Sequence, residues 1–376
     1  MRINVASFGG RTHMLDTARE LERNGHEVKF YSFVPTNRAM KFGLKSECNK
    51  SYFILALPFL ALQKLTKRSF WSQYIFQFFF DLYVGIVMSK CDIFIGQSPM
   101  HIFAIKSAKR RFKAITILER GSSHILIMAK IFQEIERNKN KQLMPTYFIK
   151  RDLKGYELAD YISIASDFQK RGFLDYGIDS SKLLVNMYGT SISQFYATSY
   201  PVDNVFDVIM VGNWCYRKGC DLIIEAVKKI NISFLHIGSI GDLEFPLEDN
   251  FSHIDTVDQK KLINYYKRAK VFVLPSREDG FGMVLSQAVA CGLPIVCSKN
   301  TGGPDLKKLF DNTEWIIEMN DYSSDCLADC LLNALELSEK QKKYSVRDYV
   351  GDRIHDFTWD AYGKRYQKNL NKILKN

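Results

Sequence analysis

Residues 275–294 read PSREDGFGMVLSQAVACGLP, and this stretch decides the fold. An apolar strand over 271–274 ends just before it, a loop with Gly280 and Gly282 follows, and a helix runs from about 283 to 290. The glycines let the backbone approach a ligand, and the unpaired amides of the first helical turn favour a phosphate. A βα unit with a tight glycine turn and nothing bound is the alternative.

The same alternation of strands and helices occurs on both sides of this stretch. Strands that alternate with helices imply parallel sheets covered on both faces. The sequence therefore predicts an α/β fold with two Rossmann-like, doubly wound domains that face each other across a cleft. The expected units are strands 3–7, 28–33, 92–96 and 114–118 with helices 13–24 and 99–110, then strands 206–211, 234–237, 271–274 and 294–297 with helices 221–229 and 283–290.

A chain of 376 residues is long enough for two domains. The segment 195–204 includes Pro201 and lacks apolar periodicity, so we place the linker there. This gives an N-terminal domain over 1–195 and a C-terminal domain over 205–355. The segment 359–375 is expected to form a helix that packs back on the first domain. Ligands of such sheets bind at the carboxyl ends of the strands, which predicts a site in the cleft.

Composition indicates an ordered globular protein, and net charge indicates anionic partners. A hydrophobic content of 46% and a charged content of 25% are typical of an ordered globular chain. The formal net charge of +11 favours nucleic acid, an anionic membrane surface or phosphorylated small molecules, without choosing among them. The eight cysteines contain no CxxC pair, which indicates buried thiols in a reducing compartment. The apolar run at the N-terminus is too short for a signal peptide, so we expect a cytoplasmic location.

Several motifs occur in a fixed order along nearly the whole chain. Asp279 and Gln287 are separated by seven positions around a Gly-Phe-Gly loop. With the other motifs, this pair resembles the retaining GT-B glycosyltransferases of family 4 (glycosyl transferases group 1). The other motifs are Gly9-Gly10 before a helix, Asn24-Gly25-His26-Glu27-Val28, Tyr156-Glu157-Leu158-Ala159-Asp160 with Ser166, Asn186-Met187-Tyr188-Gly189 with Phe195, Val211-Gly212, Lys218-Gly219 and Thr301-Gly302-Gly303-Pro304-Asp305.

The resemblance implies a nucleotide-sugar donor held by the C-terminal domain and an acceptor bound by the N-terminal domain. Transfer would proceed with retention, without a metal or other cofactor. Lys218 would lie on the donor diphosphate and stabilise the charge of the leaving nucleotide. Asp279 would contact the hydroxyls of the transferred sugar, and Gln287 the ribose. The donor-binding loops would also include Gly280, Phe281 and Gly282 around the phosphates and Gly10 under the diphosphate or acceptor. The alternatives are a solvated turn lysine at 218 and a helix N-cap at 279.

The sequence departs from the family pattern at the donor site. The family usually has glutamate at both ends of its acidic pair, where this chain has Asp279 and Gln287. A glutamine still makes hydrogen bonds, but the stronger charge-assisted bond of a carboxylate is lost. Glu278 directly precedes Asp279 and is the alternative carboxylate for the role of Asp279. Asn213 stands where the family usually carries an arginine, and Arg217 is the residue that would compensate if it turned into the cleft.

The N-terminal half of the site is less defined. His124 follows a predicted strand and is our candidate for the residue near the sugar and acceptor, with Glu119 and Arg120 as alternatives. We expect His13 to be an ordinary helix residue. The resemblance provides no protein nucleophile, so the leaving phosphate would help to deprotonate the acceptor.

Two apolar runs, 52–62 and 70–88, are followed or flanked by basic residues. They predict core helices, a partner surface, or an amphipathic element lying on anionic lipid. A second group of basic residues forms either a solvated face or a second contact with lipid; these are Lys106, Lys109, Arg110, Arg111 and Lys113. A lipid-linked or glycan acceptor in surface polysaccharide assembly, at the inner face of the plasma membrane, would suit these features. Nucleic-acid binding is not expected, because the charges are dispersed and no recognition motif appears.

Two other functions stay open at this point. A nucleotide-sugar 2-epimerase has the same architecture, although it needs acid and base carboxylates and histidines around the donor sugar. A catalytically weakened GT-B protein that binds a partner or lipid is compatible with Gln287 and Asn213.

Overall fold

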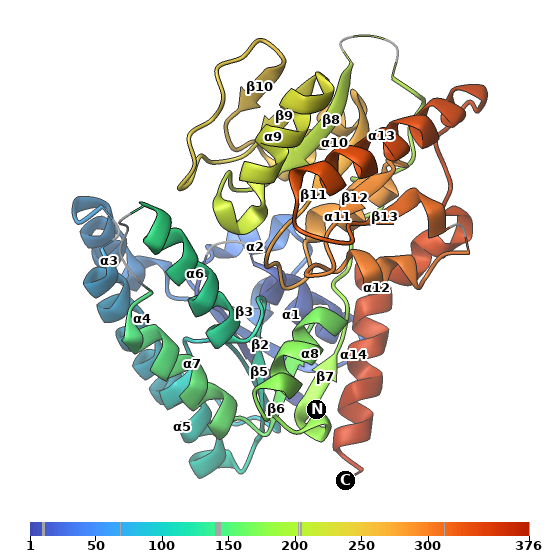
Figure 1. The fold of residues 1–376 in the computed structure, drawn as a ribbon. Helices are drawn as coiled ribbons and strands as arrows, with labels where there is room; N and C mark the ends of the chain where they lie inside the picture. The colour runs from blue at the N-terminus through green and yellow to red at the C-terminus, as the bar shows by residue number, and fades with distance from the viewer. Residues whose placement is uncertain are drawn as a thin grey trace.

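The computed structural model describes residues 1–376 except 10, 11, 68, 140–143, 202, 204, 312 and 376, and except the side chains of 135–139. Two parallel sheets, each covered by helices, form two lobes that lie one above the other (Figure 1). The predicted α/β fold with two Rossmann-like domains is confirmed.

The first sheet has seven strands within the described residues, in the order β3-β2-β1-β4-β5-β6-β7. All neighbouring strands pair in parallel. The strands are β1 (Arg2–Ala6), β2 (Glu27–Ser32), β3 (Asn49–Ser51), β4 (Ile93–Gln97), β5 (Ile115–Glu119), β6 (Tyr161–Ile164) and β7 (Leu183–Val185). The helices are α1 (His13–Arg23), α2 (Thr36–Lys41), α3 (Phe53–Leu65), α4 (Phe70–Val87), α5 (Ile102–Phe112), α6 (Ile125–Lys139), α7 (Thr146–Leu158) and α8 (Asp167–Asp175).

The second sheet has six strands within the described part of the chain, in the order β10-β9-β8-β11-β12-β13, again all parallel. Its strands are β8 (Phe206–Val211), β9 (Phe234–Ile237), β10 (Phe251–Ile254), β11 (Ala269–Leu274), β12 (Ile295–Cys297) and β13 (Ile316–Glu318). The helices are α9 (Cys220–Ile230), α10 (Ile263–Tyr266), α11 (Met283–Ala290), α12 (Gly303–Lys307), α13 (Ser324–Lys340) and α14 (Trp359–Ile373).

The central strands are apolar on both faces because helices cover both sides of each sheet. In β8, residues Val208–Val211 are all buried, and in β11 residues Val271–Leu274 are buried. The order of strands reverses direction between β1 and β4 in the first sheet and between β8 and β11 in the second. Loops after such a pair of strands separate and leave a crevice, which positions a ligand site in each domain.

The last helix, α14, belongs by its contacts to the N-terminal domain. It runs beside that domain, far from the sheet that immediately precedes it in the chain (Figure 1), and packs against α1. The Thr17 hydroxyl of α1 lies 2.8 Å from the Tyr362 hydroxyl of α14. Tyr362, Tyr366 and Leu370 are buried at i, i+4 and i+8, so they form the stripe that faces α1.

The two apolar runs form helices α3 and α4. Neither helix is fully buried in the core. Of the 13 residues of α3, Ala56 alone is buried, so the core-helix alternative is wrong for this segment. α4 buries one face and exposes Trp71, Phe78 and Phe79 on another. Among the described residues, every helix is too short or too polar to cross a bilayer.

The packing of α14 on α1 predicts a difference between two leucines at the end of the same helix. Leu370 is completely buried, whereas Leu374 is 48% exposed. We expect Leu370→Ala to lower the free energy of unfolding by about 2–5 kcal/mol, because it removes buried methyl groups and leaves a cavity. Leu374→Ala should change it by less than about 0.5 kcal/mol. Urea unfolding of both variants measures the difference, and equal effects would contradict the packing described.

Candidate functional site

The candidate site begins where β8 and β11 end side by side. β8 pairs directly with β11, and the loop after each strand carries charged residues. The loop after β8 forms a short 3-10 turn, Tyr216–Lys218, that presents Arg217 and Lys218. The loop after β11 presents Glu278 and Asp279 before α11. Neighbouring strands therefore bring two cations and two carboxylates together at the crevice of the sheet.

Gly219 allows these two loops to touch. Its φ of 72° lies in the left-handed region, and an added Cβ would stand 2.2 Å from the carbonyl oxygen of Pro275. A side chain at this position would thus both strain the backbone and push the loops apart. The Lys218-Gly219 pair is required as a unit, because the glycine lets the lysine reach the carboxylates of the next loop.

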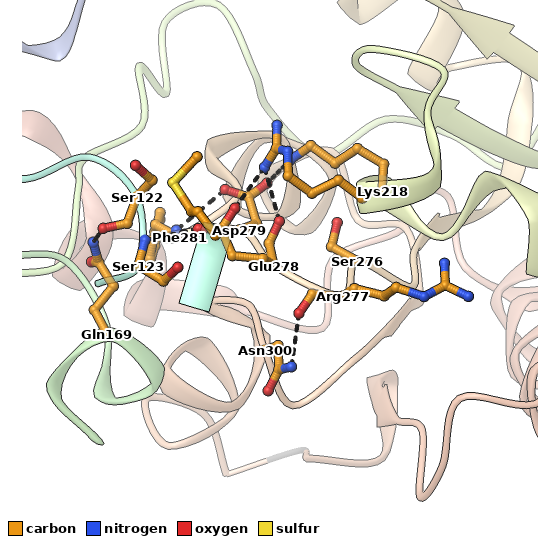
Figure 2. A network of polar contacts seen from close by, with 12 residues as sticks. Ser122, Ser123, Gln169, Lys218, Ser276, Arg277, Glu278, Asp279, Phe281 and Asn300 are labelled. Carbon is orange, nitrogen blue, oxygen red and sulfur yellow. Dashed lines mark hydrogen bonds and ion pairs between the residues drawn. The ribbon is translucent and has the colours of Figure 1, made fainter. Parts of the chain in front are cut away.

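The four charged residues form two ion pairs (Figure 2). The ammonium of Lys218 pairs with the Oδ2 of Asp279. The guanidinium of Arg217 donates to the Oε2 of Glu278 at 2.8 Å and to its carbonyl oxygen at 2.9 Å. In the pair of Arg217 with Glu278, Arg217 is 24% exposed and Glu278 is completely buried, whereas Lys218 and Asp279 keep 11% and 17% of their side-chain surface exposed. In the pair of Lys218 with Asp279, therefore, both members reach solvent.

The charges of neighbouring residues shift the pKa values of Asp279 and Arg217 toward their ionised forms. Burial acts to raise the pKa of Asp279, but the charges of Lys218 and Arg217 outweigh it, so the pKa lies below its usual value. Burial acts to lower the pKa of Arg217, and the carboxylates of Glu278 and Asp279 raise it instead. The alternative of a solvated lysine at 218 is wrong, since its ammonium is paired and mostly covered. The N-cap alternative for Asp279 is also wrong, because Gly282 is the N-cap of α11.

The glycine loop also touches the N-terminal domain. The backbone N–H of Ser123, in the loop after β5, donates to the Oε1 of Glu278 at 2.8 Å. The Ser166 hydroxyl, at the N-cap of α8, donates to the carbonyl oxygen of Gly280 at 2.6 Å. An added Cβ on Gly280 would lie 2.2 Å from the carbonyl oxygen of Gly121. Glycine at 280 is thus required for the two domains to meet here.

Buried polar side chains hold the loop after β5 in place. The Gln169 amide donates to the carbonyl oxygen of Ser122 at 2.7 Å (Figure 2). It also donates to the carbonyl oxygen of Arg120 at 2.9 Å. The Arg120 guanidinium binds the Asp152 carboxylate at 2.9 and 3.0 Å. The sequence predicted no role for Ser123, Gln169 or Asp152. Ser166 lay in a motif quoted above, but its bond to Gly280 joins residues 114 positions apart, and no local pattern indicates that.

The structure buries His124 among aromatic rings. His124 is 1% exposed, with its ring 4.5 Å from that of Tyr176 and 5.0 Å from that of Tyr156. Burial and then the charge of Arg120 lower its pKa to about 4, which makes it neutral. This aromatic surrounding does not fit the predicted contact of His124 with the donor sugar.

A buried cluster faces Phe281 from the N-terminal domain. The Tyr188 hydroxyl donates to Glu119 Oε1 at 3.1 Å and lies 3.2 Å from Nε2 of His13. The ring of Tyr188 meets that of Phe281 edge-on at 5.8 Å. Burial, and then the Glu119 carboxylate, raise the pKa of Tyr188. His13, the first residue of α1, thus belongs with Glu119 to a polar cluster whose Tyr188 ring contacts Phe281.

The remaining predicted donor-binding residues lie in different places. Gln287 is 6% exposed, one turn into α11, where its Oε1 accepts a hydrogen bond from the Tyr266 hydroxyl at 3.3 Å. Asn213 accepts a hydrogen bond from Ser239 at 2.8 Å, on the loop after β9, rather than from the charged cluster. Gly10 lies outside the described residues. In the described part of the chain, no group of three or more His, Cys, Asp or Glu side chains is placed to hold a metal ion.

A cavity of about 830 Å³ lies elsewhere, among α1, residues 190–194 and the start of α14. None of the four charged residues described above lines it. We take the ends of β8 and β11 as the candidate site instead, because two cations and two carboxylates converge there.

A second contact between the domains lies next to the site. Asp305, on α12, accepts a hydrogen bond from the backbone N–H of Asp167 at 3.0 Å. Lys308 pairs with the carboxylate of the same Asp167. Burial, and to a lesser extent the charge of Asp167, raise the pKa of Asp305 to about 6.

Comparison with known proteins agrees with this arrangement. Residues 199–349 match the family model of glycosyl transferases group 1. An uncharacterized glycosyltransferase of Methanocaldococcus jannaschii is 32% identical over 102 residues, which are 25% of this chain and 29% of that protein. Sucrose-phosphate synthase of Thermosynechococcus elongatus is similar in structure, with a TM-score of 0.69, 16% identity, and coverage of 100% of this chain and 99% of that one. An Anabaena protein in complex with UDP and glucose has a TM-score of 0.64 at 14% identity, with 99% and 100% covered.

These likenesses show the GT-B fold across the whole chain. The match of residues 199–349, within the C-terminal half of the chain, to glycosyl transferases group 1 and the relatives named as glycosyltransferases support a transferase. The chain spans less than half the length of the curated relatives it matches.

The raised pKa of Asp305 predicts a pH dependence with a definite sign. The unfolded carboxyl has a pKa near 4, so between about pH 4 and 6 the folded chain binds more protons at this residue, and its contribution to stability falls as pH rises. Asp305→Asn keeps the oxygen that accepts from Asp167 and cannot ionise. We expect the variant to gain about 1–3 kcal/mol over the wild type at pH 7.5 relative to pH 4.5, measured by urea unfolding.

The matched control for this prediction is Asp249→Asn, since that side chain is exposed on the same domain. Its difference from the wild type should not change with pH over the same window. If Asp305→Asn and Asp249→Asn behave alike, the buried carboxyl is not responsible.

Proposed function

We propose that this chain is a retaining glycosyltransferase that moves a sugar from a nucleotide-sugar donor to a glycan or lipid-linked acceptor. The observation that carries the proposal is the meeting of Lys218 and Arg217 with Asp279 and Glu278 between the two domains. The cations suit a diphosphate, and an ionised carboxylate suits the hydroxyls of a sugar. A donor placed between the two loops would have its charged part and its sugar next to the matching side chains.

In this proposal, donor binding replaces the ion pair between Lys218 and Asp279. The diphosphate takes the ammonium, and the freed carboxylate accepts hydrogen bonds from the sugar. Both charged groups have a partner again after this exchange, so neither Lys218 nor Asp279 is left buried and unpaired. The N–H groups at the start of α11, behind Gly282, face the phosphates as a helix N-terminus does. Arg217 stays on Glu278 and keeps the loop closed against the N-terminal domain.

The transfer step breaks the bond between the anomeric carbon and the diphosphate oxygen. The oxygen of an acceptor hydroxyl bonds to the same face of that carbon, and its proton goes to the leaving diphosphate. Lys218 stabilises the negative charge that develops on the leaving oxygen. In this scheme the ammonium does the work that a divalent cation does in many transferases, so we propose that the reaction needs no metal.

We propose UDP as the nucleotide, because the Anabaena structure of the same fold holds UDP and glucose. We propose a lipid-linked or glycan acceptor and a role in surface polysaccharide assembly because α3 and α4 expose apolar side chains. An apolar surface on the acceptor domain would hold the enzyme at a membrane, where lipid-linked acceptors are found.

The basic residues near this surface support the membrane proposal in part. Lys64 and Lys67 are exposed at the end of α3, and Lys106, Arg110 and Lys113 are exposed on and after α5. The other two basic residues of that second group have structural partners. Lys109 pairs with Asp160, and Arg111 donates to the carbonyl oxygens of Gly85 and Ile86 at the end of α4. The available charge is therefore smaller than the sequence alone indicates.

The donor proposal predicts different defects when Lys218 and Asp279, the two members of one ion pair, are changed. UDP should raise the melting temperature of the wild type by several degrees. Lys218→Ala should weaken UDP binding by about tenfold or more, because the diphosphate loses its cation. Asp279→Asn should bind UDP within about threefold of the wild type and lose about 100-fold in sugar transfer from UDP-glucose. A thermal-shift titration and a release assay for UDP measure both.

Lys260→Ala is the matched control, because Lys260 is an exposed lysine of the same domain. Equal UDP binding by Lys218→Ala and Lys260→Ala would contradict the proposed diphosphate site. Conversion of labelled UDP-glucose to an epimer without any acceptor would show a 2-epimerase instead. Normal UDP binding with neither transfer nor hydrolysis of the donor would show a binding protein.

The membrane proposal predicts co-sedimentation with vesicles that contain phosphatidylglycerol and weaker binding to pure phosphatidylcholine. Leu65→Asp and Phe79→Asp should reduce binding, because these side chains are 82% and 53% exposed on α3 and α4. Leu247→Asp is the control, since Leu247 is 98% exposed but belongs to the other domain. Equal losses in all three variants would indicate nonspecific adsorption, and binding should weaken in high salt.

A further inference from the structure

A cavity of about 350 Å³ lies in the N-terminal domain beside the candidate site. It is open to solvent and is lined by residues of α4, α6 and α7, of the segment before α7, and of the loops that follow β4 and β5. These loops lie at the carboxyl edge of the first sheet, where α/β domains bind ligands. Its lining divides into a polar floor and apolar walls, and nothing in the proposed donor chemistry uses either.

The floor of the cavity offers hydrogen-bond acceptors. Gln77 is 4% exposed, and among the described residues its Oε1 has no hydrogen-bond partner. Asp152 is 1% exposed and receives hydrogen bonds from Ser98 and Arg120. A buried acceptor without a partner is rare in folded proteins and requires an explanation. A hydroxyl group of a ligand would supply the missing donor.

The floor is also electrically neutral. Arg120 is the one cation among the described lining residues, and its guanidinium is already committed to Asp152, to the carbonyl oxygen of Ser123 at 3.0 Å and to the sulfur of Met128 at 3.3 Å. A phosphate placed here would have to compete with all three of these partners for the guanidinium. The floor therefore suits a neutral, hydroxylated group rather than an anion.

The walls suit an apolar chain. They include Phe70, Met128, Phe132 and Phe148. Phe70 is also 37% exposed, which places it at the mouth of the cavity. Next to it on α4, Trp71 is 52% exposed and continues the apolar surface outward. A ligand with an apolar tail would thus leave the cavity along the exposed face of α4.

The cavity shares structural elements with the candidate donor site. Arg120 and Ser122 line it, and they belong to the loop whose Ser123 N–H binds Glu278. Helix α6, which supplies Met128 and Phe132, also packs against the turn that carries Arg217 and Lys218. A group bound in the cavity would therefore lie one loop away from the charged cluster.

We propose that this cavity is the acceptor site and that the acceptor is a neutral amphiphile. Its hydroxylated end would lie against Gln77, Ser98 and Asp152, and its apolar tail would pass between Phe70 and Phe148 to the surface of α4. The inference rests on the proposed function, because it assigns the acceptor class of the same reaction. It differs from membrane contact in that one molecule occupies a defined cavity.

The experiment uses the full chain and three small probes below their critical micelle concentrations, measured by isothermal titration calorimetry. We expect n-octyl β-D-glucoside to bind saturably at one site. Methyl β-D-glucoside lacks the tail, and n-octyl phosphate carries a charge, so each should bind at least about tenfold more weakly. Equal affinity for octyl glucoside and octyl phosphate would overturn the neutral floor and with it the proposal.

Variants distinguish the cavity from the exposed surface of α4. Gln77→Leu removes the unpartnered amide at nearly constant volume, and Met128→Trp fills the cavity. Each should weaken octyl glucoside at least about fivefold. Phe78→Ser is the control, because Phe78 is 47% exposed on α4 and does not line the cavity. Retained binding in both cavity variants, or an equal loss in Phe78→Ser, would overturn the proposal.

UDP binding, measured on the same preparations, separates this inference from the proposed function. Met128→Trp should keep the thermal shift given by UDP, which also shows that the variant is folded. If UDP gives no shift in any preparation while the glucoside results are as expected, the donor proposal fails and the cavity stands as an amphiphile site. If UDP binds and the cavity variants leave octyl glucoside unaffected, the acceptor assignment fails alone.

Discussion

The carboxylate of Glu278 is the interaction on which the arrangement of the two domains depends. It is completely buried, and a buried carboxylate is strongly unfavourable unless it is paired and hydrogen-bonded. One oxygen binds Arg217 from the neighbouring loop, and the other binds the Ser123 N–H from the other domain. The domains must therefore meet at this point to keep the charge satisfied. Separation would leave this group to find water instead.

The two ion pairs differ in what they are able to exchange. The Arg217–Glu278 pair is tied to both domains and has a completely buried member, so releasing it would expose an unpaired charge. The Lys218–Asp279 pair retains some exposure on both sides. A ligand with an anion at one end and hydroxyls at the other offers each partner an equivalent bond. The sequence difference from the usual glutamate matters here, because the shorter Asp279 side chain already reaches Lys218.

Much of the fold could be predicted from the sequence, because continuous apolar runs bounded by glycine mark the central strands. The bounds expected for β8, β9 and α11 are those observed. The exposure of α3 could not be predicted, since an apolar run indicates a helix without saying what covers it. Edge strands such as β3 and β7 have three residues each and carry too little pattern to be recognised.

The donor half of the site was easier to predict than the acceptor half for a physical reason. Lys218 and Asp279 lie in loops whose glycines and following helices mark them locally. Ser123 and Glu278 meet across 155 positions of sequence, and no local signal records that contact. The two histidines illustrate the same limit, because both follow strands and only packing places His13 against Tyr188 and His124 among aromatic rings.

The loop after β5 links the two halves of the site mechanically. Gln169 and the Arg120–Asp152 pair fix its backbone from within the N-terminal domain, while Ser123 and Gly121 present that backbone to the other domain. All of the supporting polar groups are buried, so movement of the loop would break several satisfied bonds at once. The N-terminal half is therefore a rigid surface with a preformed cavity beside this loop. Any opening of the cleft would have to break the bonds that cross between the domains, which include those of Gly280 with Ser166, Glu278 with Ser123 and Asp305 with Asp167.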